Sequence, residues 1–366
     1  MSSINVTRSI LPPIDKYIEY VRSIWESGQL TNNGPLVKEF ELLLATEFGV
    51  KHVVLVSSGT VAIQIALKAL GIEGVVLTTP FSFVATSSAI AWQGIEFDFA
   101  DIDAESLCLS PDKLSEQMSP DVGAIMGTHV FGNACDIEGI EKISKKWGVP
   151  VIYDAAHTYG ATYKGRSLMA YGDVSILSLH ATKLFHSVEG GVLATNDESL
   201  AKKFSYMRNF GFASPEAFQG VGINGKMSEF HAAMGLSLLG NMSEVISARI
   251  ELVDLYDSYF YEIEEVSRPV QSDHAISNAA YYPIILPSET AVLGVLKELE
   301  CEGVFARRYF YPCLTELPYS RKSDVPIAED ISLRVLCLPL YYGLTNEEVV
   351  KIVNCVKMYF SSCLSK

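Results

Sequence analysis

Between about residues 50 and 200, short apolar runs alternate with longer segments whose apolar residues recur at helical spacing. The short runs are rich in Val, Ile and Phe, which is typical of buried strands, so we expect strands at 53–56, 75–78, 96–99, 124–126, 151–154, 174–178 and 192–195. Helices are expected between them at 60–70, 84–92 and 137–147. This alternation predicts an α/β fold with a mainly parallel, seven-stranded sheet covered by helices on both faces.

The pattern changes after about residue 200, where long helical stretches at 228–239 and 244–265 come first. A strand at 281–286 and a helix at 289–300 follow, which predicts a second, smaller α/β unit. We therefore expect an N-terminal arm over residues 1–25 that packs on this unit, a large domain over 26–240 and a small C-terminal domain over 241–366.

Composition narrows the functional classes. The chain has 366 residues, of which 49% are hydrophobic, and a net charge of −15, so it repels a phosphate backbone and no nucleic acid is expected as a partner. No apolar run has the ~20 residues that cross a bilayer, and no secretion signal is recognisable, which predicts a cytoplasmic protein without a membrane. Seven scattered cysteines without a Cys-x-x-Cys pair indicate free thiols in a reducing compartment.

Three segments carry candidate chemistry, and the first is Ser57-Ser58-Gly59-Thr60, between a predicted strand and a predicted helix. Gly59 allows the backbone to approach a ligand closely. The free N–H groups and the dipole at a helix start favour an anion. The simpler alternative is an N-cap by Ser57 or Ser58.

The second segment is Val151–His157, in which an apolar strand ends in Asp154 and small residues lead to His157. Ligands in parallel sheets bind at the carboxyl ends of strands, so a carboxylate there is placed to meet one. Beside a heteroaromatic ring nitrogen it would favour the protonated, electron-withdrawing ring. A helix N-cap remains the alternative for Asp154, and an interior histidine for His157.

The third segment places Lys183 five residues after a strand end at Ser178, in an uncharged stretch, with Gly190-Gly191 allowing a tight return into the next strand. A buried lysine has a lowered pKa and can attack aldehydes as a nucleophile. The alternative is a surface lysine in a loop.

The order of these segments is more specific than any one of them: an anion-binding turn, a strand-end Asp, and a Lys 29 residues later. The chain resembles the DegT/DnrJ/StrS class of sugar-nucleotide aminotransferases, which have the type I fold of pyridoxal-5'-phosphate (PLP) enzymes. Further matching blocks extend over nearly the whole chain, at residues 31–35, 40–41, 79–86, 97–103, 129–132 and 221–233.

The resemblance implies a role for several residues. Lys183 would form the Schiff base with PLP and act as the catalytic base, and Asp154 would bind the pyridine nitrogen. The other cofactor-binding residues would be Gly59, Thr60 and Ser178 at the phosphate, Phe83 stacked on the ring, His157 near the ring hydroxyl, and Asn224 reaching the phosphate of a neighbouring subunit in a homodimer. Substrate contacts would come from His186, Arg307 and Tyr309. No metal site is expected, because the histidines and cysteines show no ligand spacing.

The chain departs from the family pattern at two places. Gly225-Lys226 follows Asn224 where Tyr-Arg is common, and the residues around Lys183 lack the usual flanking Pro or Gly and Asn. The second departure resembles enzymes that aminate C4 of dTDP-4-keto-6-deoxyglucose. His186 could reach a sugar or diphosphate there, or could simply be packed inside the chain.

The function implied by the resemblance is transfer of an amino group from L-glutamate to a nucleotide-linked keto sugar. The best candidate converts dTDP-4-keto-6-deoxy-D-glucose to dTDP-4-amino-4,6-dideoxy-D-glucose for O-antigen or other surface polysaccharide. Alternatives are a 3-aminotransferase on a dTDP-3-keto-6-deoxyhexose and a 4-aminotransferase on a GDP- or UDP-sugar. A sugar dehydratase of the same fold would replace Lys183 with His, and a non-catalytic regulatory relative would lack Lys183 or Asp154.

Overall fold

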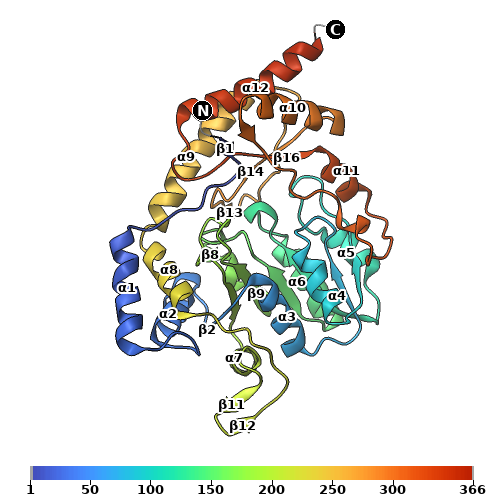
Figure 1. Ribbon diagram of the computed structural model, residues 1–366. Coiled ribbons are helices and arrows are strands. Elements are labelled where there is room, and N and C mark those ends of the chain that lie inside the picture. Colours follow the sequence, from blue (N-terminus) through green and yellow to red (C-terminus); the bar gives the residue numbers. More distant parts are fainter. Residues whose placement is uncertain (1–2, 365–366) are drawn as a thin grey trace.

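The computed structural model describes residues 3–364, with side chains as far as residue 362. Its centre is a seven-stranded sheet, and each of the seven strands predicted from the apolar runs is a strand of this sheet (Figure 1). In spatial order they are β2 (His52–Val56), β10 (Gly191–Thr195), β9 (Val174–Ser178), β6 (Val151–Asp154), β5 (Val122–Thr128), β3 (Val75–Thr78) and β4 (Phe97–Phe99). Six strands are parallel, and β10 is antiparallel to both of its neighbours.

Helices cover both faces of this sheet. They are α2 (Pro35–Phe48), α3 (Gly59–Leu70), α4 (Ala85–Trp92), α5 (Pro111–Gln117), α6 (Ile137–Trp147), α7 (Glu198–Met207) and α8 (Glu229–Leu239), and α1 (Ile14–Ser27) packs outside them on α8. The alternation of side chains along a strand decides which core each residue joins. In β10, Leu193 packs with the α3 side chains, whereas Val192 and Ala194 pack with those of α2 and α8.

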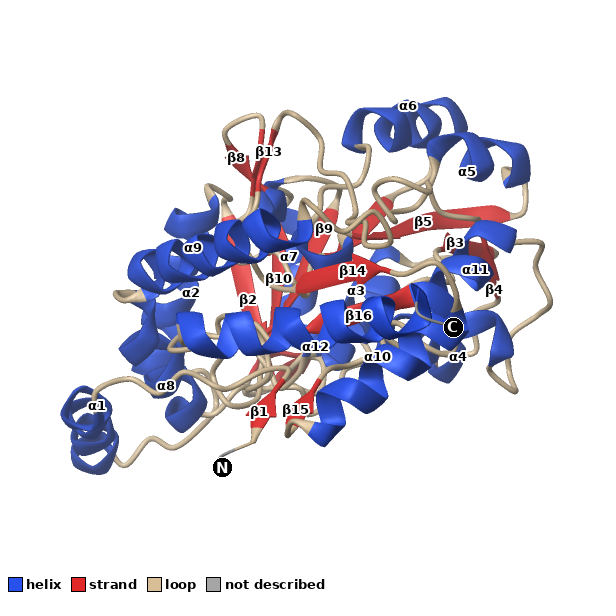
Figure 2. Cartoon of the chain, turned by 90° about the horizontal axis from the view of Figure 1, so that it is seen from above, coloured by secondary structure: helices blue, strands red, loops and turns tan. Residues whose placement is uncertain are grey.

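The C-terminal part builds a separate core above the sheet. It contains α9 (Met242–Phe260), β13 (Ala275–Ile276), β14 (Tyr282–Ile285), α10 (Glu289–Cys301), β15 (Val304–Phe305), α11 (Pro326–Arg334), β16 (Val335–Leu338) and α12 (Asn346–Leu364). Helices α9, α10 and α12 pack against the antiparallel pair β14–β16 (Figure 2). The predicted helix 244–265 is too long, since α9 ends at Phe260 before the acidic stretch that contains Glu262, Glu264 and Glu265.

The N-terminal segment contacts both parts of the molecule. Its strand β1 (Ile4–Asn5) pairs with β15, while its helix α1 lies against α8. Two further small sheets are formed by β7 (Thr162–Tyr163), β8 (Arg166–Ser167) and β13, and by the hairpin of β11 (Phe212–Ser214) and β12 (Ala217–Phe218). The domain boundaries at residues 25 and 240 stay predictions.

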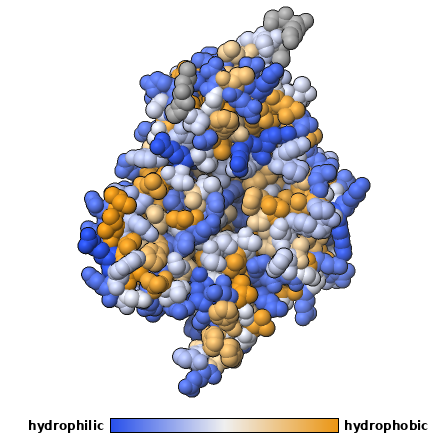
Figure 3. All heavy atoms as spheres, in the orientation of Figure 1, coloured by the Kyte–Doolittle hydropathy of each residue, from blue (hydrophilic) through white to orange (hydrophobic). Residues whose placement is uncertain are grey.

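The hairpin β11–β12 projects from the molecule and carries exposed apolar side chains (Figure 3). Phe218 is 69% exposed, and Val221 just after the hairpin is 72% exposed. Within residues 3–364 no helix combines the length and apolar character needed to span a membrane. The six cysteines whose side chains are described are free thiols, and Cys363 lies outside them.

Candidate active site

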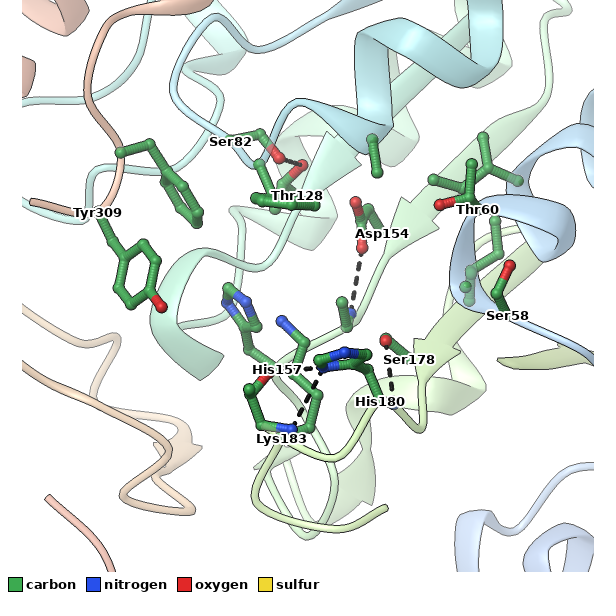
Figure 4. Close-up of a pocket in the computed structure, with 18 of the residues that line it drawn as sticks. Ser58, Thr60, Ser82, Thr128, Asp154, His157, Ser178, His180, Lys183 and Tyr309 are labelled. Carbon is green, nitrogen blue, oxygen red and sulfur yellow. Dashed lines mark hydrogen bonds between the residues drawn. The ribbon is translucent and has the colours of Figure 1, made fainter. Parts of the chain in front are cut away.

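A cavity of about 420 Å³ opens at the carboxyl ends of the parallel strands, below the C-terminal part (Figure 4). Its floor comes from the start of α3, the ends of β5, β6 and β9, and the loop that carries Lys183. Its roof comes from later residues: Tyr281, Arg307, Tyr309 and Phe310. The cavity therefore joins side chains from both parts of the chain at the edge where α/β sheets bind ligands.

Asp154 is the last residue of β6, and its carboxylate points into the cavity although the residue is only 6% exposed. Its Oδ2 accepts a hydrogen bond of 2.8 Å from the Thr86 hydroxyl, and its Oδ1 accepts one of 3.1 Å from the Ala156 N–H. Burial nevertheless raises the pKa of the Asp154 carboxyl above its usual value. A cation in the cavity would lower the free-energy cost of this buried charge.

A chain of buried hydroxyl groups leads to this carboxylate. The Thr128 hydroxyl donates to Ser82 at 3.2 Å, Ser82 and Thr86 share a hydrogen bond of 2.9 Å, and Thr86 donates to Asp154. Because each hydroxyl can donate toward the next, the chain favours the ionised carboxylate. These three residues were not among the predicted site residues, since Ser82 and Thr86 stood out only as part of a family block.

Lys183 lies in the loop between β9 and β10, and its amine faces the same cavity as Asp154 (Figure 4). The loop is held by backbone hydrogen bonds from Ser187 N–H to Leu179 at 2.9 Å and from Ala181 N–H to Val188 at 2.8 Å. Burial lowers the pKa of the Lys183 amine, and the nearby Asp154 charge partly opposes that shift. A larger neutral fraction makes the amine a better nucleophile.

His157 follows three residues after Asp154, and its ring packs between two aromatic side chains. The centroid of the His157 ring lies 4.7 Å from that of Tyr281 and 6.0 Å from that of Phe310. The His157 and Phe310 rings are nearly parallel, with an angle of 7° between their planes. His157 is 7% exposed, and its buried Nδ1 has no hydrogen-bond partner among the described residues. Burial and the Lys183 charge lower the pKa of the imidazole, so it is neutral and has an unused polar atom.

The start of α3 provides the anion-binding end of the cavity. Ser58 caps the helix by accepting a hydrogen bond from Val61 N–H, which leaves Gly59 and Thr60 at the cavity wall. A Cβ atom on Gly59 would lie 3.1 Å from Cβ of Ser178, so the close approach of helix and strand end favours glycine. Backbone N–H groups of the first helical turn, together with the Ser178 hydroxyl, suit a phosphate.

Three other predicted residues also line the cavity. Phe83 is 54% exposed on one side, and Arg307 and Tyr309 lie together in the roof, with 3.4 Å between Nη1 of Arg307 and the Tyr309 hydroxyl. The mouth also contains Glu189, whose carboxylate lies 3.6 Å from Nε2 of His180. Sequence reasoning did not assign roles to Glu189, His180, Tyr281 or Phe310, because no local motif marks them.

Two predicted residues lie elsewhere. Asn224 is exposed on the segment after the β11–β12 hairpin and does not line this chain's own cavity. His186 is buried beside the N-terminal segment, where its Nε2 is 2.8 Å from the Ile10 carbonyl and its Nδ1 accepts from Val188 N–H. Since both ring nitrogens of His186 are satisfied by the backbone, the structure supports packing of this ring and not contact with a sugar.

The chemistry of this site fits PLP. Asp154 is a buried carboxylate that a pyridinium would neutralise, His157 has an unpaired nitrogen, and the glycine at the α3 start leaves room for a phosphate. With a lysine amine facing the same space on this type of sheet, the fold and site define a PLP-dependent enzyme of fold type I. Among the described residues no group of three or more potential metal ligands was found.

The chain belongs to the DegT/DnrJ/EryC1/StrS aminotransferase family, which matches residues 14–357. A dTDP-4-amino-4,6-dideoxy-D-glucose transaminase from Shigella dysenteriae is 37% identical over 358 residues, covering 96% of this chain and 98% of that protein. The Escherichia coli enzyme of the same name is 34% identical, and a GDP-perosamine synthase from Vibrio cholerae is 30% identical over 94% of this chain and 96% of its own.

Solved structures agree with this assignment. The structure of DesI in the presence of its TDP-sugar product superposes with a TM-score of 0.93 at 31% identity, covering 98% of this chain and 93% of that one. A Helicobacter pylori aminotransferase, PseC, has a TM-score of 0.91 at 24% identity and so confirms the fold alone. The protein is therefore a PLP-dependent sugar-nucleotide aminotransferase.

Proposed function

We propose that this enzyme transfers the amino group of L-glutamate to C4 of dTDP-4-keto-6-deoxy-D-glucose, giving dTDP-4-amino-4,6-dideoxy-D-glucose for O-antigen or other surface polysaccharide. The observation that carries the proposed chemistry is that the Lys183 amine and the Asp154 carboxylate face one cavity. The choice of sugar is supported by the two full-length relatives named for that amino sugar.

In this proposal each residue acts through the position described above. When bound, PLP supplies an aldehyde for a lysine amine and a protonated ring that withdraws electrons from the substrate carbon. Asp154 holds the proton on the ring nitrogen, aided by the hydrogen bond from Thr86. Lys183 would hold the cofactor, and its free amine would move the proton at the substrate carbon.

The remaining residues orient the ligands. Gly59, Thr60 and Ser178 would hold the phosphate at the α3 start, Phe83 would cover one face of the ring, and the imidazole of His157, which lines the cavity, would lie near the cofactor. Arg307 and Tyr309 in the roof are placed to meet the sugar nucleotide. Because a chain with a net charge of −15 repels anions over long range, these local groups must supply the attraction.

We also propose a homodimer with shared active sites. Asn224 is exposed on the segment after the projecting hairpin and does not line this chain's own cavity. In a dimer with twofold symmetry it would reach the phosphate in the partner's site. The exposed Phe218 and Val221 of the same region would be covered by that contact.

A GDP-linked substrate is the second candidate, because GDP-perosamine synthases are about as long as this chain and 30% identical to it. The experiment is to offer glutamate with dTDP-, GDP- and UDP-linked 4-keto-6-deoxy sugars and a dTDP-3-keto-6-deoxyhexose, and to identify each product by NMR. The proposal expects kcat/KM to be highest for the dTDP-4-keto sugar with amination at C4. A preference for the GDP sugar, or amination at C3, would refute the substrate assignment.

A further inference from the structure

Asn278, in the segment that leads to β14, reaches across to the turn that carries His157. Its Nδ2 donates to the His157 carbonyl at 2.7 Å and to the Tyr159 carbonyl at 2.8 Å. Its Oδ1 accepts from Ala280 N–H at 3.1 Å, and the side chain is fully buried. Both amide hydrogens are used and face carbonyl groups, so only this orientation of the amide satisfies all partners.

The segment around Asn278 is itself held firmly. Arg249 of α9 is buried without a carboxylate and donates to the carbonyls of Ala279 at 2.8 Å, Ala280 at 2.7 Å and Leu340 at 2.9 Å. On the opposite side, a Cβ atom on Gly132 would lie 2.6 Å from Oδ1 of Asn278. The amide thus has little room to move relative to either part of the chain.

The same segment also contacts the His157 side chain directly. Tyr281, three residues after Asn278, places its ring 4.7 Å from the His157 ring at an angle of 60°. One short stretch of the C-terminal part therefore holds both the backbone carbonyl of His157 and its imidazole. Among the described residues, no other hydrogen bond holds the His157 backbone from outside the turn 155–159.

We propose that Asn278 is a positioning residue for the cofactor site, which acts by fixing the backbone of His157 so that its imidazole keeps its place in the wall of the cavity. This inference rests on the proposed placement of His157 beside the cofactor. Asn278 touches neither the cavity nor a reacting atom. Its effect on the bound cofactor must therefore pass through His157.

The test uses Asn278→Asp in the full-length enzyme reconstituted with PLP. The carboxylate keeps the acceptor for Ala280 N–H but places a second oxygen against the carbonyls of His157 and Tyr159, which lose their donors. We expect weaker PLP binding, a shifted midpoint in the pH titration of the bound cofactor's absorbance, and a loss in kcat/KM of about tenfold or more. If Asn278→Asp does not fold, Asn278→Ser, which keeps one shorter donor, replaces it.

The matched control is Tyr256→Phe, which removes a buried hydrogen bond of 2.9 Å from the Tyr256 hydroxyl to the Pro339 carbonyl in the same C-terminal core. It is expected to lower the melting temperature but to leave the absorbance titration unchanged. A shift with Tyr256→Phe equal to that of Asn278→Asp would overturn the proposal, because general loosening would then explain both.

A double-mutant cycle decides whether the effect passes through His157. In a His157→Ala background, adding Asn278→Asp should change PLP affinity by less than about twofold and the titration midpoint by less than about 0.3 pH unit, both relative to His157→Ala alone. Full additivity would overturn the inference about Asn278. If His157→Ala alone changes neither observable, the proposed role of His157 fails instead, so the two failures are distinguishable.

Discussion

At the scale of single residues, the buried Asp154 carboxylate is the group with the strongest dependence on the cofactor. Burial raises its pKa in the folded chain above the unfolded value of 3.8, so the folded state binds this proton more tightly. The protonated Asp154 carboxyl therefore contributes to the free energy of unfolding at low pH, and this contribution is lost as the pH rises through the folded-state pKa. A bound pyridinium would remove the cost of the ionised form.

This leads to a prediction for cofactor-free protein. Asp154→Asn should gain free energy of unfolding relative to wild type as the pH rises above about 4, and the gain should level off above the folded-state pKa. Urea unfolding of both proteins from pH 4 to 8, without and with PLP, measures it. With PLP bound, the wild type should have the higher free energy of unfolding, since only the wild type gains the contact between carboxylate and pyridinium. A difference that does not change with pH would contradict the assignment.

Lys183 gives a second prediction at this scale. Because burial lowers its pKa below the usual 10.5, attachment of PLP should become faster with rising pH and level off below pH 10.5. Stopped-flow absorbance with cofactor-free enzyme measures the rate, and borohydride reduction followed by peptide mass spectrometry locates the modified lysine. Asp154→Asn should move the plateau to lower pH, since the Asp154 charge raises the Lys183 pKa. Lys183→Arg should show no attachment at the loop.

The sequence predicts those residues that stand at the ends of strands. Asp154 and Lys183 could be found because an apolar strand followed by a polar residue marks the functional edge of a parallel sheet. Thr86 and Asn278 could not, since each acts on a partner far along the chain, 68 residues away for Thr86 and 121 for Asn278. The packing of His186 could not be predicted for the same reason, because Ile10, whose carbonyl lies beside its Nε2, is 176 residues away.

At the scale of secondary-structure elements, α2 begins without a capping side chain of its own. Its N-cap is Gly34, and the buried Glu229 of α8 accepts hydrogen bonds from Leu36 N–H at 2.8 Å and Val37 N–H at 3.2 Å. A Cβ atom on Gly34 would lie only 2.6 Å from the Glu229 carboxyl carbon. The glycine and the acid together fasten α2 to α8.

We predict that Glu229→Ala lowers the free energy of unfolding by about 1–3 kcal/mol, because two buried N–H groups at a positive helix end lose their acceptor. Glu229→Gln keeps the side-chain volume and one of the two acceptor oxygens, so it should lose less than Glu229→Ala. Urea denaturation measures both. Equal losses for Ala and Gln would contradict this prediction, because Gln keeps the side-chain volume and one acceptor oxygen; no loss for Gln would show that volume, and not the hydrogen bonds, accounts for the effect.

The sequence predicts the elements that have strong apolar periodicity, but it does not predict the direction of a strand or the end of a helix. The run at 192–195 predicted a strand, but no local property indicates that β10 runs antiparallel between β2 and β9. Helix α9 stops at Phe260 although the helical pattern continues to Glu265, because the buried face of the helix ends there. The hairpin β11–β12 has too few residues to show a pattern.

At the scale of the whole molecule, shared active sites predict that two inactive variants complement each other. Mixing Lys183→Ala chains with Asn224→Ala chains should yield dimers in which one site has both native residues. Random exchange would restore about a quarter of the wild-type kcat, since half of the dimers are mixed and each has one intact site. Sedimentation establishes the dimer, and PLP content gives an independent readout. No recovery above the sum of the separate variants would contradict a site shared through Asn224.

The hairpin of β9 and β10 has a mechanical consequence for turnover. The loop with Lys183 leaves the sheet at Ser178 and returns at Gly191, and these two residues are paired with each other. Both ends of the loop are therefore fixed to the central sheet. The opposing wall, from Tyr281 to Phe310, belongs to the later part of the chain. A movement of that wall away from the sheet would admit a bulky nucleotide and release the aminated product, while Lys183 stays in the same position relative to the sheet.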